Sequence, residues 1–330
     1  MEPRKPFSKE IILLEDLEAA TKEITNKLQQ DVLVSFKRNG AVIGISGGID
    51  SSVCMALAVR AFGADKVVGI IMPEKDSSPD SEELALELAG KFGVRTIKEV
   101  ITGALDGFKC YNRRDEAVKR VFPEYDPATY KMKIGIRQSG LYNNLPPLFT
   151  LSIIDKDGVQ QDKMLHTKEY LQIVAASNFK QRSRMSILYY HAEALHYAVI
   201  GTPNKHEQEQ GFFVKHGDGA GDVMPIGNLY KTQVYQFAEY MGVPRRIIER
   251  TPTTDTYSAE QTQEEFFYQL PFRLMDIYWY GFENGYSPGE VAAVMGETTE
   301  RVDSLFRNFE RKRKTTEYLR MPPVRDYFGI

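Results

Sequence analysis

The sequence predicts an α/β fold built on a doubly wound, mostly parallel sheet, and three features support this prediction. Short apolar segments alternate with longer amphipathic segments between Leu14 and Ile101. The short segments are apolar throughout, as expected of buried strands. Polar or glycine-rich turns join the segments, and this alternation is typical of right-handed crossovers between parallel strands. A ligand is therefore expected at the carboxyl ends of the strands.

The first part of the chain contains the following expected elements. Apolar side chains at helical spacing predict a helix within residues 14–37, and Asn39-Gly40 supplies its stop. The expected strands are residues 41–45, 67–71 and 95–101, and the expected helix after the first strand covers residues 50–62. Asp80 and Glu83 have the spacing of a capping box, so another helix is expected to begin there.

The alternation is lost after Gly103, and the rest of the chain is organised differently. Residues 103–166 are interpreted as an insertion with a hairpin turn at Asp157-Gly158. The elements expected after it are a long helix at 167–198, the end of a strand at 199–201, and a helix at 231–241 that stops at Gly242. The whole chain, residues 1–330, is interpreted as a single domain that ends in a helical extension over residues 270–330.

Composition narrows the class of protein. With 42% hydrophobic and 26% charged residues, the chain is typical of globular proteins, and its net charge of -3 provides no global field for nucleic acid. The helical patterns around Gly296 resemble a helix-turn-helix, which keeps nucleic-acid binding as a minor alternative. Cys54 and Cys110 lack metal-site spacing, and we find no signal peptide or membrane span. A cytoplasmic protein is expected.

The stretch from Gly44 to Ser52 has the composition of a phosphate-binding turn. It reads Gly44-Ile45-Ser46-Gly47-Gly48-Ile49-Asp50-Ser51-Ser52 and lacks the lysine that ends a Walker A loop. Adjacent glycines allow close approach of the backbone to phosphate, and the following helix offers unpaired N–H groups. Asp50 would repel phosphate unless Mg²⁺ lies between them. The alternative is a simple glycine-rich turn with Asp50 as a helix cap.

This stretch resembles the Ser-Gly-Gly-x-Asp-Ser loop of the ATP pyrophosphatases, and within them the NAD synthases. Further motifs resemble that family in the same order along the chain. They are Met72-Pro73 with Ser77-Ser78, Asn178 to Met185, Gly201 to Glu207, Gly211 to Asp222, Leu229 to Val234, and Pro252 to Asp255. The resemblance implies an adenine nucleotide alpha hydrolase-like fold and ATP as co-substrate.

The resemblance also implies roles for particular residues. The residues matched to catalytic positions are Asp50, Lys231 and Asp222. Those matched to ATP contacts are Gly44, Ile45, Ser46, Gly47, Gly48, Ile49, Asp50, Ser51, Thr202, Lys231 and Thr253. Those matched to contacts with the acyl substrate, deamido-NAD, are Arg182, Lys215 and Asp222, and Asp50 and Glu207 match the Mg²⁺ ligands. Hard carboxylate ligands and a lysine beside a triphosphate suit this chemistry.

The implied reaction forms an amide. The carboxylate of deamido-NAD attacks the α-phosphate of ATP, pyrophosphate leaves, and ammonia then displaces AMP from the acyl-adenylate. The chain has no extra length for an amidase domain, so ammonia is expected free or from a separate protein. The family also implies a homodimer with substrate near its interface.

One departure from the family leaves an alternative open. Tyr318-Leu319 stands where the family commonly has a His-Lys pair that contacts deamido-NAD, and the nearby run Arg311-Lys312-Arg313-Lys314 offers substitute positive charge. The alternative function is therefore an AMP-forming amide ligase of the same fold that acts on another small carboxylate.

Overall fold

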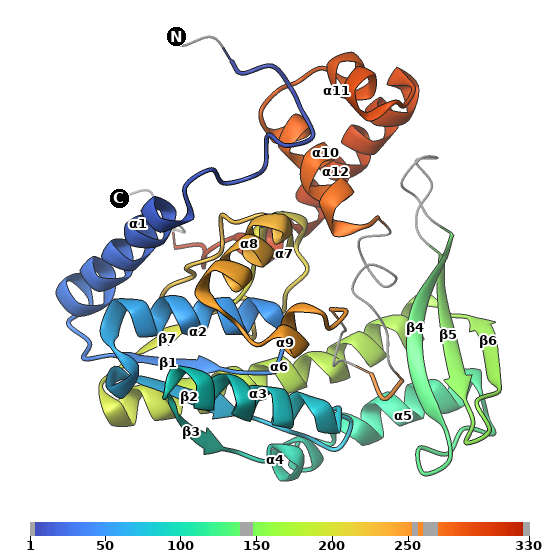
Figure 1. Ribbon diagram of the computed structural model, residues 1–330. Coiled ribbons are helices and arrows are strands. Elements are labelled where there is room, and N and C mark those ends of the chain that lie inside the picture. The colour runs from blue at the N-terminus through green and yellow to red at the C-terminus, as the bar shows by residue number, and fades with distance from the viewer. Residues whose placement is uncertain (1–3, 139–147, 253–256, 260–269, 326–330) are drawn as a thin grey trace.

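The computed structural model describes residues 4–138, 148–252, 257–259 and 270–325, and its centre is a parallel sheet (Figure 1). The sheet has four strands in the order β3-β2-β1-β7. They are β1 (Ala41–Gly44), β2 (Val67–Ile71), β3 (Arg95–Lys98) and β7 (Ala198–Ile200). Neighbouring strands all pair in parallel. After β1, the chain adds β2 and β3 on one side of it, and β7 later pairs with its other side. The place where β1 and β7 meet is therefore a topological switch point, where α/β proteins bind ligands.

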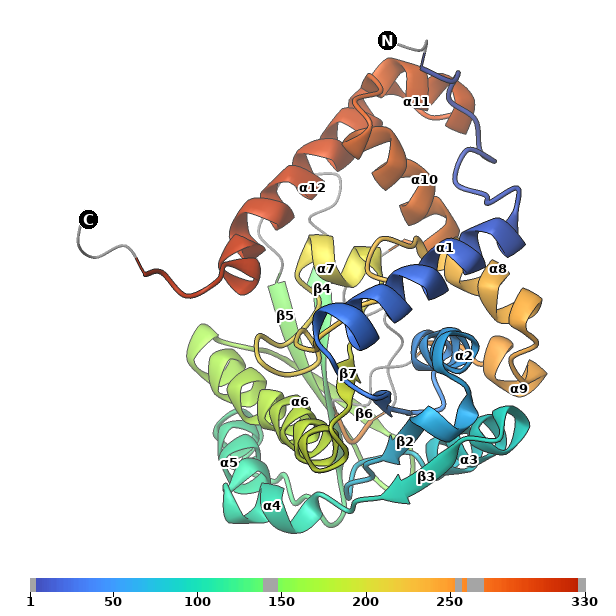
Figure 2. The same cartoon turned by 90° about the vertical axis from the view of Figure 1, so that its left-hand side faces the viewer.

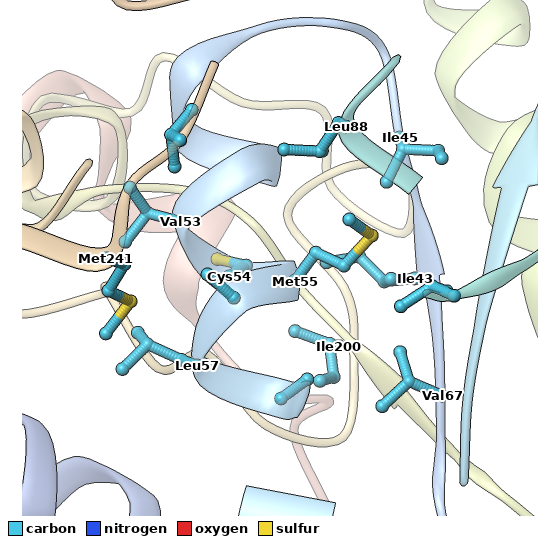
Figure 3. Close-up of a cluster of buried hydrophobic side chains, with 14 of the residues drawn as sticks. Ile43, Ile45, Val53, Cys54, Met55, Leu57, Val67, Leu88, Ile200 and Met241 are labelled. Carbon is cyan, nitrogen blue, oxygen red and sulfur yellow. The ribbon is translucent and has the colours of Figure 1, made fainter. Parts of the chain in front are cut away.

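Helices cover both faces of this sheet, which confirms the doubly wound prediction. The helices of one face are α1 (Leu17–Gln29), α2 (Ile49–Phe62), α3 (Pro79–Phe92) and α8 (Lys231–Met241). Helix α2 is enclosed on all sides, and its central residues from Val53 to Ala58 are fully buried among side chains of the strands and of α8 (Figure 3). Burial of this apolar segment fixes the position of its N-terminus, which follows the glycine-rich loop.

The opposite face is covered by the 29-residue helix α6 (Thr167–Leu195) together with α4 (Thr102–Gly107) and α5 (Cys110–Val121). Met185 and Leu188 of α6 pack against Val42 of β1 and Val199 of β7. Hydrophobic contacts on both faces explain why the strands are apolar throughout.

Between β3 and α6 the chain leaves the parallel sheet. It forms α4 and α5 and then an antiparallel sheet of β4 (Lys131–Gln138), β5 (Leu148–Ile154) and β6 (Gln160–Met164). The predicted turn is present, because Gly158 has a φ of 81° between β5 and β6. This small sheet has its own apolar cluster, which includes Met132, Ile134, Leu151 and Ile153. It stands beside the parallel sheet, at the end of α5 and α6 (Figure 1).

The C-terminal helices form a further unit above the sheet. They are α10 (Phe272–Glu283), α11 (Pro288–Met295) and α12 (Thr299–Arg320), which pack around the buried Trp279. Phe7 and Ile12 from the N-terminal segment complete this cluster. The short helix α7 (Lys205–Gln210) packs against α12, and the short helix α9 (Arg245–Ile248) packs against α8. Helix α12 runs past α7 towards the C-terminus (Figure 2).

Several predicted boundaries need correction. The capping box at Asp80 and Glu83 is wrong, because α3 begins at Pro79 after Ser78. Proline has the φ that the first helical position requires, and it sets the start of this helix. The first helix ends at Gln29 and continues as a π-helical turn, η1 (Gln30–Ser35). A short 3₁₀ turn, η2 (Ala64–Lys66), joins α2 to β2. Over the ranges described above, no helix is long and apolar enough to cross a membrane.

Candidate active site

The glycine-rich loop connects β1 to α2 at the switch point of the sheet. Ile45 and Ile49 point into the core, so the loop offers its backbone and serine hydroxyls to a ligand. Gly47 has a φ of 70°, and a Cβ there would lie 2.8 Å from Cβ of Leu84 on α3. Both the backbone conformation and the close approach require glycine at this position.

Serine hydroxyls stabilise the start of α2. Ser51 Oγ and Ser52 Oγ donate to the carbonyl oxygen of Gly48 over 3.0 and 2.8 Å. Ser46 Oγ lies 3.4 Å from Ser51 Oγ and accepts from the N–H of Gly48. Ser52 is fully buried, whereas Ser46 is exposed and, with Ser51, lines both cavities described below. Ser46 and Ser51 are therefore the serines of the loop that a ligand can reach.

Asp50 does not act as a helix cap, because it makes contacts across the site. The N-cap of α2 is Gly48, and Asp50 Oδ2 forms an ion pair with Nζ of Lys231 at the first turn of α8. Asp50 Oδ1 accepts from Asn204 Nδ2 over 3.3 Å. Lys231 is fully buried, and although burial disfavours its charge, Asp50 and Glu207 raise its pKa above the ordinary value. A charged Lys231 is thus held beside Asp50.

Glu207 is placed by a capping box at the start of α7. Its N–H donates to Asn204 Oδ1 over 3.2 Å, and its carboxylate accepts from the N–H of Asn204 over 2.9 Å. Burial and the negative charge of Asp50 raise the pKa of Glu207 to about 8, and Lys231 only partly offsets them. Asp218 adds further negative charge, and burial raises its own pKa to about 6. The ionised form of Glu207 is therefore disfavoured here, and a bound cation would favour it.

Two adjoining cavities open at this group. The smaller, of about 160 Å³, is lined by the loop, Asp50, Glu207, Thr202 and Arg250. The larger, of about 1080 Å³, is at the upper end of the size range of small-molecule sites. It extends from the loop along α6 to α12 and reaches Phe149 and Tyr170 beside the small antiparallel sheet. The rings of Phe149 and Tyr170 stack with centroids 4.2 Å apart.

A second charged cluster borders the large cavity, and we call it the Lys180 cluster. Lys180 Nζ contacts Glu74 Oε1 at 2.9 Å and Asp76 Oδ2 at 2.8 Å. Arg114 contacts Asp76 at 2.5 Å and Asp115 at 2.8 Å, and Tyr111 donates to Glu74. These side chains come from α5, α6 and the segment after β2. The cluster thus ties the insertion to the parallel sheet.

The structure brings together most of the residues that the sequence implicated in ATP binding. Those lining one or both cavities are Gly44, Ile45, Ser46, Gly48, Ile49, Asp50, Ser51, Thr202 and Glu207. Gly47, also in the loop, is buried, and Lys231 is connected to the site by its ion pair with Asp50. Thr253 lies outside the described residues.

The three residues predicted to bind the acyl substrate lie elsewhere. None of Arg182, Lys215 and Asp222 lines the two cavities that the described residues form. Arg182 Nε donates to the carbonyl oxygen of Lys215, and Lys215 Nζ donates to the carbonyl oxygens of Tyr318 and Met321 at the end of α12. Asp222 accepts from the N–H of Val199 over 2.7 Å and from Tyr189. Their roles in substrate binding stay predictions.

Other residues at the site were missed. Asn204 holds both Asp50 and Glu207, and the Asn-x-x-Glu spacing of a capping box was a readable signal for it. Arg184 lines the large cavity and lies in the same motif as Arg182. Gln210 also lines the cavity, as do Arg311 and Lys312 of the basic run that the sequence had already indicated. No sequence pattern indicates that α12 returns to α7.

Comparisons with known proteins agree with this geometry. The sequence model of the NAD synthase family matches residues 20–145 and 147–316. An NH(3)-dependent NAD(+) synthetase of Mesorhizobium japonicum is 46% identical over 94% of this chain and 96% of that protein. One from Methanocaldococcus jannaschii is 33% identical over 91% of this chain and 95% of its own.

Solved structures share the fold at lower identity. An NMN synthetase from Francisella tularensis matches 94% of this chain and 98% of its own with a TM-score of 0.64 and 21% identity. An NH3-dependent NAD synthetase from Campylobacter jejuni matches 94% of this chain and 100% of its own with a TM-score of 0.60 and 21% identity. The family model and the relatives in sequence both extend over nearly the whole chain. This protein therefore belongs to the NAD synthase family.

Proposed function

We propose that this protein amidates deamido-NAD to NAD with ammonia, at the expense of ATP, which is cleaved to AMP and pyrophosphate. The observation that carries the proposal is the junction of two cavities at the loop. The smaller one joins a phosphate-binding turn to Asp50, Glu207 and Lys231, and the larger one adjoins it with room for a second substrate. The relatives named NH(3)-dependent NAD(+) synthetases support the same reaction.

The acidic residues of the smaller cavity fit a Mg²⁺ ion. Asp50 and Glu207 offer carboxylate oxygens. The raised pKa of Glu207 indicates that its ionised form is disfavoured, and a bound cation would favour that form. The described residues contain no group of three His, Cys, Asp or Glu side chains placed as a metal site. Beside nucleotides, Mg²⁺ binds through one or two carboxylates and the substrate's phosphates, so Asp50 and Glu207 would suffice. Mg²⁺ would neutralise charge on those phosphates.

The chain's own residues align the two substrates. N–H groups of the loop and of α2 bind the phosphates of ATP, and Lys231 offsets their negative charge. A carboxylate oxygen of the acyl substrate then attacks the α-phosphorus, the bond to the bridging oxygen breaks, and pyrophosphate leaves. Ammonia adds to the activated acyl carbon, AMP departs with the bonding electrons, and the nitrogen releases a proton to water. Positioning and charge neutralisation account for the acceleration, because no covalent enzyme intermediate is needed.

The remaining roles are those that the resemblance to the family implies for Arg182, Lys215 and Asp222. By its contacts with Val199 and Tyr189, Asp222 would fix the segment that follows Gly219 against β7. Arg182, Lys215 and Asp222 would contact deamido-NAD at the interface of a homodimer, where Arg182 and Asp222 are exposed. Ammonia would come from solution or from a separate protein. The buried free thiols of Cys54 and Cys110 suit a cytoplasmic location.

The test follows NAD, AMP and pyrophosphate together after addition of ATP, Mg²⁺, ammonium and deamido-NAD. We expect equal amounts of the three products, and we expect Asp50→Ala to abolish pyrophosphate release because it removes a metal ligand and the partner of Lys231. Asp162→Ala, an exposed carboxylate of β6, is the control and should leave the rate unchanged. ADP in place of AMP would contradict adenylation. AMP formation only with another small carboxylate would establish the alternative amide ligase.

A further inference from the structure

One buried carboxylate joins the two helices that carry Glu207 and Lys231. Asp276 of α10 is fully buried, and its two oxygens have different partners. Its Oδ1 lies 2.5 Å from Nε2 of His206, which precedes Glu207 in α7. Its Oδ2 accepts from the backbone N–H of Thr232 over 2.7 Å, and Thr232 follows Lys231 in α8. Asp276 therefore holds the first turns of both helices from a third helix.

The contact with α8 is one that a carboxylate makes well. The first N–H groups of a helix have no partner within the helix and lie at the positive end of its dipole. Thr232 is the second residue of α8, so its N–H is one of these groups. A hydrogen bond from such a group to a carboxylate is stronger than one to a neutral acceptor. Any displacement of Asp276 would therefore displace the backbone beside Lys231.

Helix α10 also contributes to the surroundings of the Lys231 ammonium group. Lys231 is fully buried, so protein atoms rather than solvent set the position of this charge. Its Nζ pairs with Asp50 and lies 5.3 Å from the ring centroid of Phe272, which is one turn before Asp276 on α10. The benefit of a charge to a transition state depends on where the charge is held. Helix α10 is thus placed to control the distance between Lys231 and the reacting phosphates.

A second carboxylate of α10 makes a comparable bridge at a more exposed place. Glu283 Oε2 pairs with Nζ of Lys205 over 3.1 Å, and Glu283 Oε1 accepts from the hydroxyl of Tyr230. These partners also belong to the starts of α7 and α8, but the contacts are with the ends of long side chains. The side chain of Glu283 is 21% exposed. Glu283 can therefore shift without moving either backbone, which makes it a matched comparison for Asp276.

We propose that Asp276 is a positioning residue for catalysis, which acts by holding Lys231 in place beside Asp50. His206 anchors Asp276 to α7, the helix of Glu207. The inference rests on the proposed function, in which Lys231 offsets the negative charge of the phosphates of ATP. Many contacts along the glycine-rich loop bind ATP, whereas charge develops on pyrophosphate only during the reaction. A displaced Lys231 should therefore lower kcat more than it raises KM for ATP.

The first test compares Asp276→Asn with Glu283→Gln in steady-state assays of the full chain with ATP, Mg²⁺, ammonium and deamido-NAD. Asparagine has the shape of aspartate but offers Thr232 a neutral acceptor. We expect kcat to fall about 10- to 100-fold, as small misplacements of reacting groups do, with KM for ATP changed by less than about 3-fold. Glu283→Gln should keep kcat within about 2-fold, because its ion pair is partly exposed. Urea denaturation gives the folded fraction to which each rate refers.

A double-mutant cycle separates positioning from a purely structural role. If Asp276 acts through Lys231, Asp276→Asn has no ammonium group to misplace in a Lys231→Met background. Its effect on kcat should then shrink to less than about 2-fold, because the two changes remove the same contribution. A purely structural role would lower kcat by the same factor in both backgrounds. Radiolabelled ATP makes the low rate of the Lys231→Met chain measurable.

A second variant, His206→Gln, decides the question if Asp276→Asn does not fold. Glutamine keeps a donor for Asp276 on a more flexible side chain, so kcat should fall by a smaller factor of about 3- to 10-fold. That loss should also disappear in the Lys231→Met background. An unchanged kcat in Asp276→Asn, or an equal loss in both backgrounds, overturns the inference and leaves the proposed function standing. Absence of AMP formation by the unaltered chain overturns both.

Discussion

Two clusters of charged side chains border the same cavity but differ in electrostatic balance. In the Lys180 cluster, burial alone would raise the pKa of Asp76, but Lys180 and Arg114 outweigh it and hold that pKa below its ordinary value. The Lys231 cluster consists of Lys231, Asp50, Glu207 and Asn204. There burial and Asp50 prevail over Lys231, and the pKa of Glu207 rises to about 8.

From this difference we infer that the Lys180 cluster stabilises the fold and that the Lys231 cluster takes part in the chemistry. Cations and hydrogen bonds satisfy the carboxylates of the Lys180 cluster, so this cluster can stabilise the junction between insertion and sheet without a ligand. In the Lys231 cluster, by contrast, the ionised form of Glu207 is disfavoured beside the glycine-rich loop. A bound cation would favour that ionised form, and we propose on this ground that the Lys231 cluster is the chemical site.

The largest expected effect comes from replacing the cation of the Lys231 cluster. Lys231→Met keeps an apolar stem of similar length but leaves Asp50, and the phosphates of ATP, without their positive partner. We expect AMP formation to fall about 10³-fold, which corresponds to about 4 kcal/mol of transition-state stabilisation. The rate is measured under saturating ATP, with circular dichroism to confirm folding. Lys91→Met, on the exposed surface of α3, should retain the normal rate. A loss of less than 10-fold would contradict a role for Lys231 in catalysis.

In the Lys180 cluster the corresponding change should act on stability. Arg114→Met leaves Asp115 without its cation and Asp76 with Lys180 alone, and breaking a buried ion pair typically costs about 3–5 kcal/mol of unfolding free energy. Urea denaturation measures this cost, and the rate per folded molecule should remain within a few-fold of normal. Arg120→Met removes a more exposed arginine of the same helix and should cost less than 1 kcal/mol. If Arg114→Met lost activity without losing stability, the distinction between the two clusters would be wrong.

The same contrast explains what the sequence could predict. The loop from Gly44 to Ser52, the strand before it and the helix after it were predictable, because local apolar patterns and glycine chemistry define them. Asn204 lies in a recognisable capping box, so its contact with Asp50 was within reach. The Lys180 cluster was not, because Glu74, Arg114 and Lys180 lie far apart in sequence and no local pattern pairs them.

The end of the large cavity beside α12 depended even more on tertiary structure. The basic run beginning at Arg311 suggested positive charge near the substrate, but only the packing of α12 on α7 shows that Arg311 and Lys312 face the cavity. Lys215, predicted to bind substrate, instead donates to carbonyl oxygens at the end of α12. These positions depend on contacts between helices more than 100 residues apart in sequence.

The smallest expected effect tests the cost of burying the ionised carboxylate of Asp218. Burial raises the pKa of Asp218 to about 6, so its ionised form is less favourable in the folded state than in the unfolded chain. This cost is fully present above pH 6 and disappears as pH falls towards the ordinary pKa of aspartate. Asp218→Asn removes the charge, and its carbonyl oxygen can still accept from the N–H of Val214, as Asp218 does over 2.8 Å.

We therefore expect Asp218→Asn to raise the unfolding free energy by about 1 kcal/mol at pH 7.5 in buffer without Mg²⁺, and by less at pH 4.5. Urea denaturation at the two pH values measures the difference. Asp76→Asn is the matched change in the Lys180 cluster and should lower stability at pH 7.5, because a lowered pKa stabilises the fold above the ordinary pKa of aspartate. The comparison requires that Asp218→Asn raises the unfolding free energy at pH 7.5 and that Asp76→Asn lowers it. If both destabilised the fold equally, burial would not disfavour the charge of Asp218 as its raised pKa indicates.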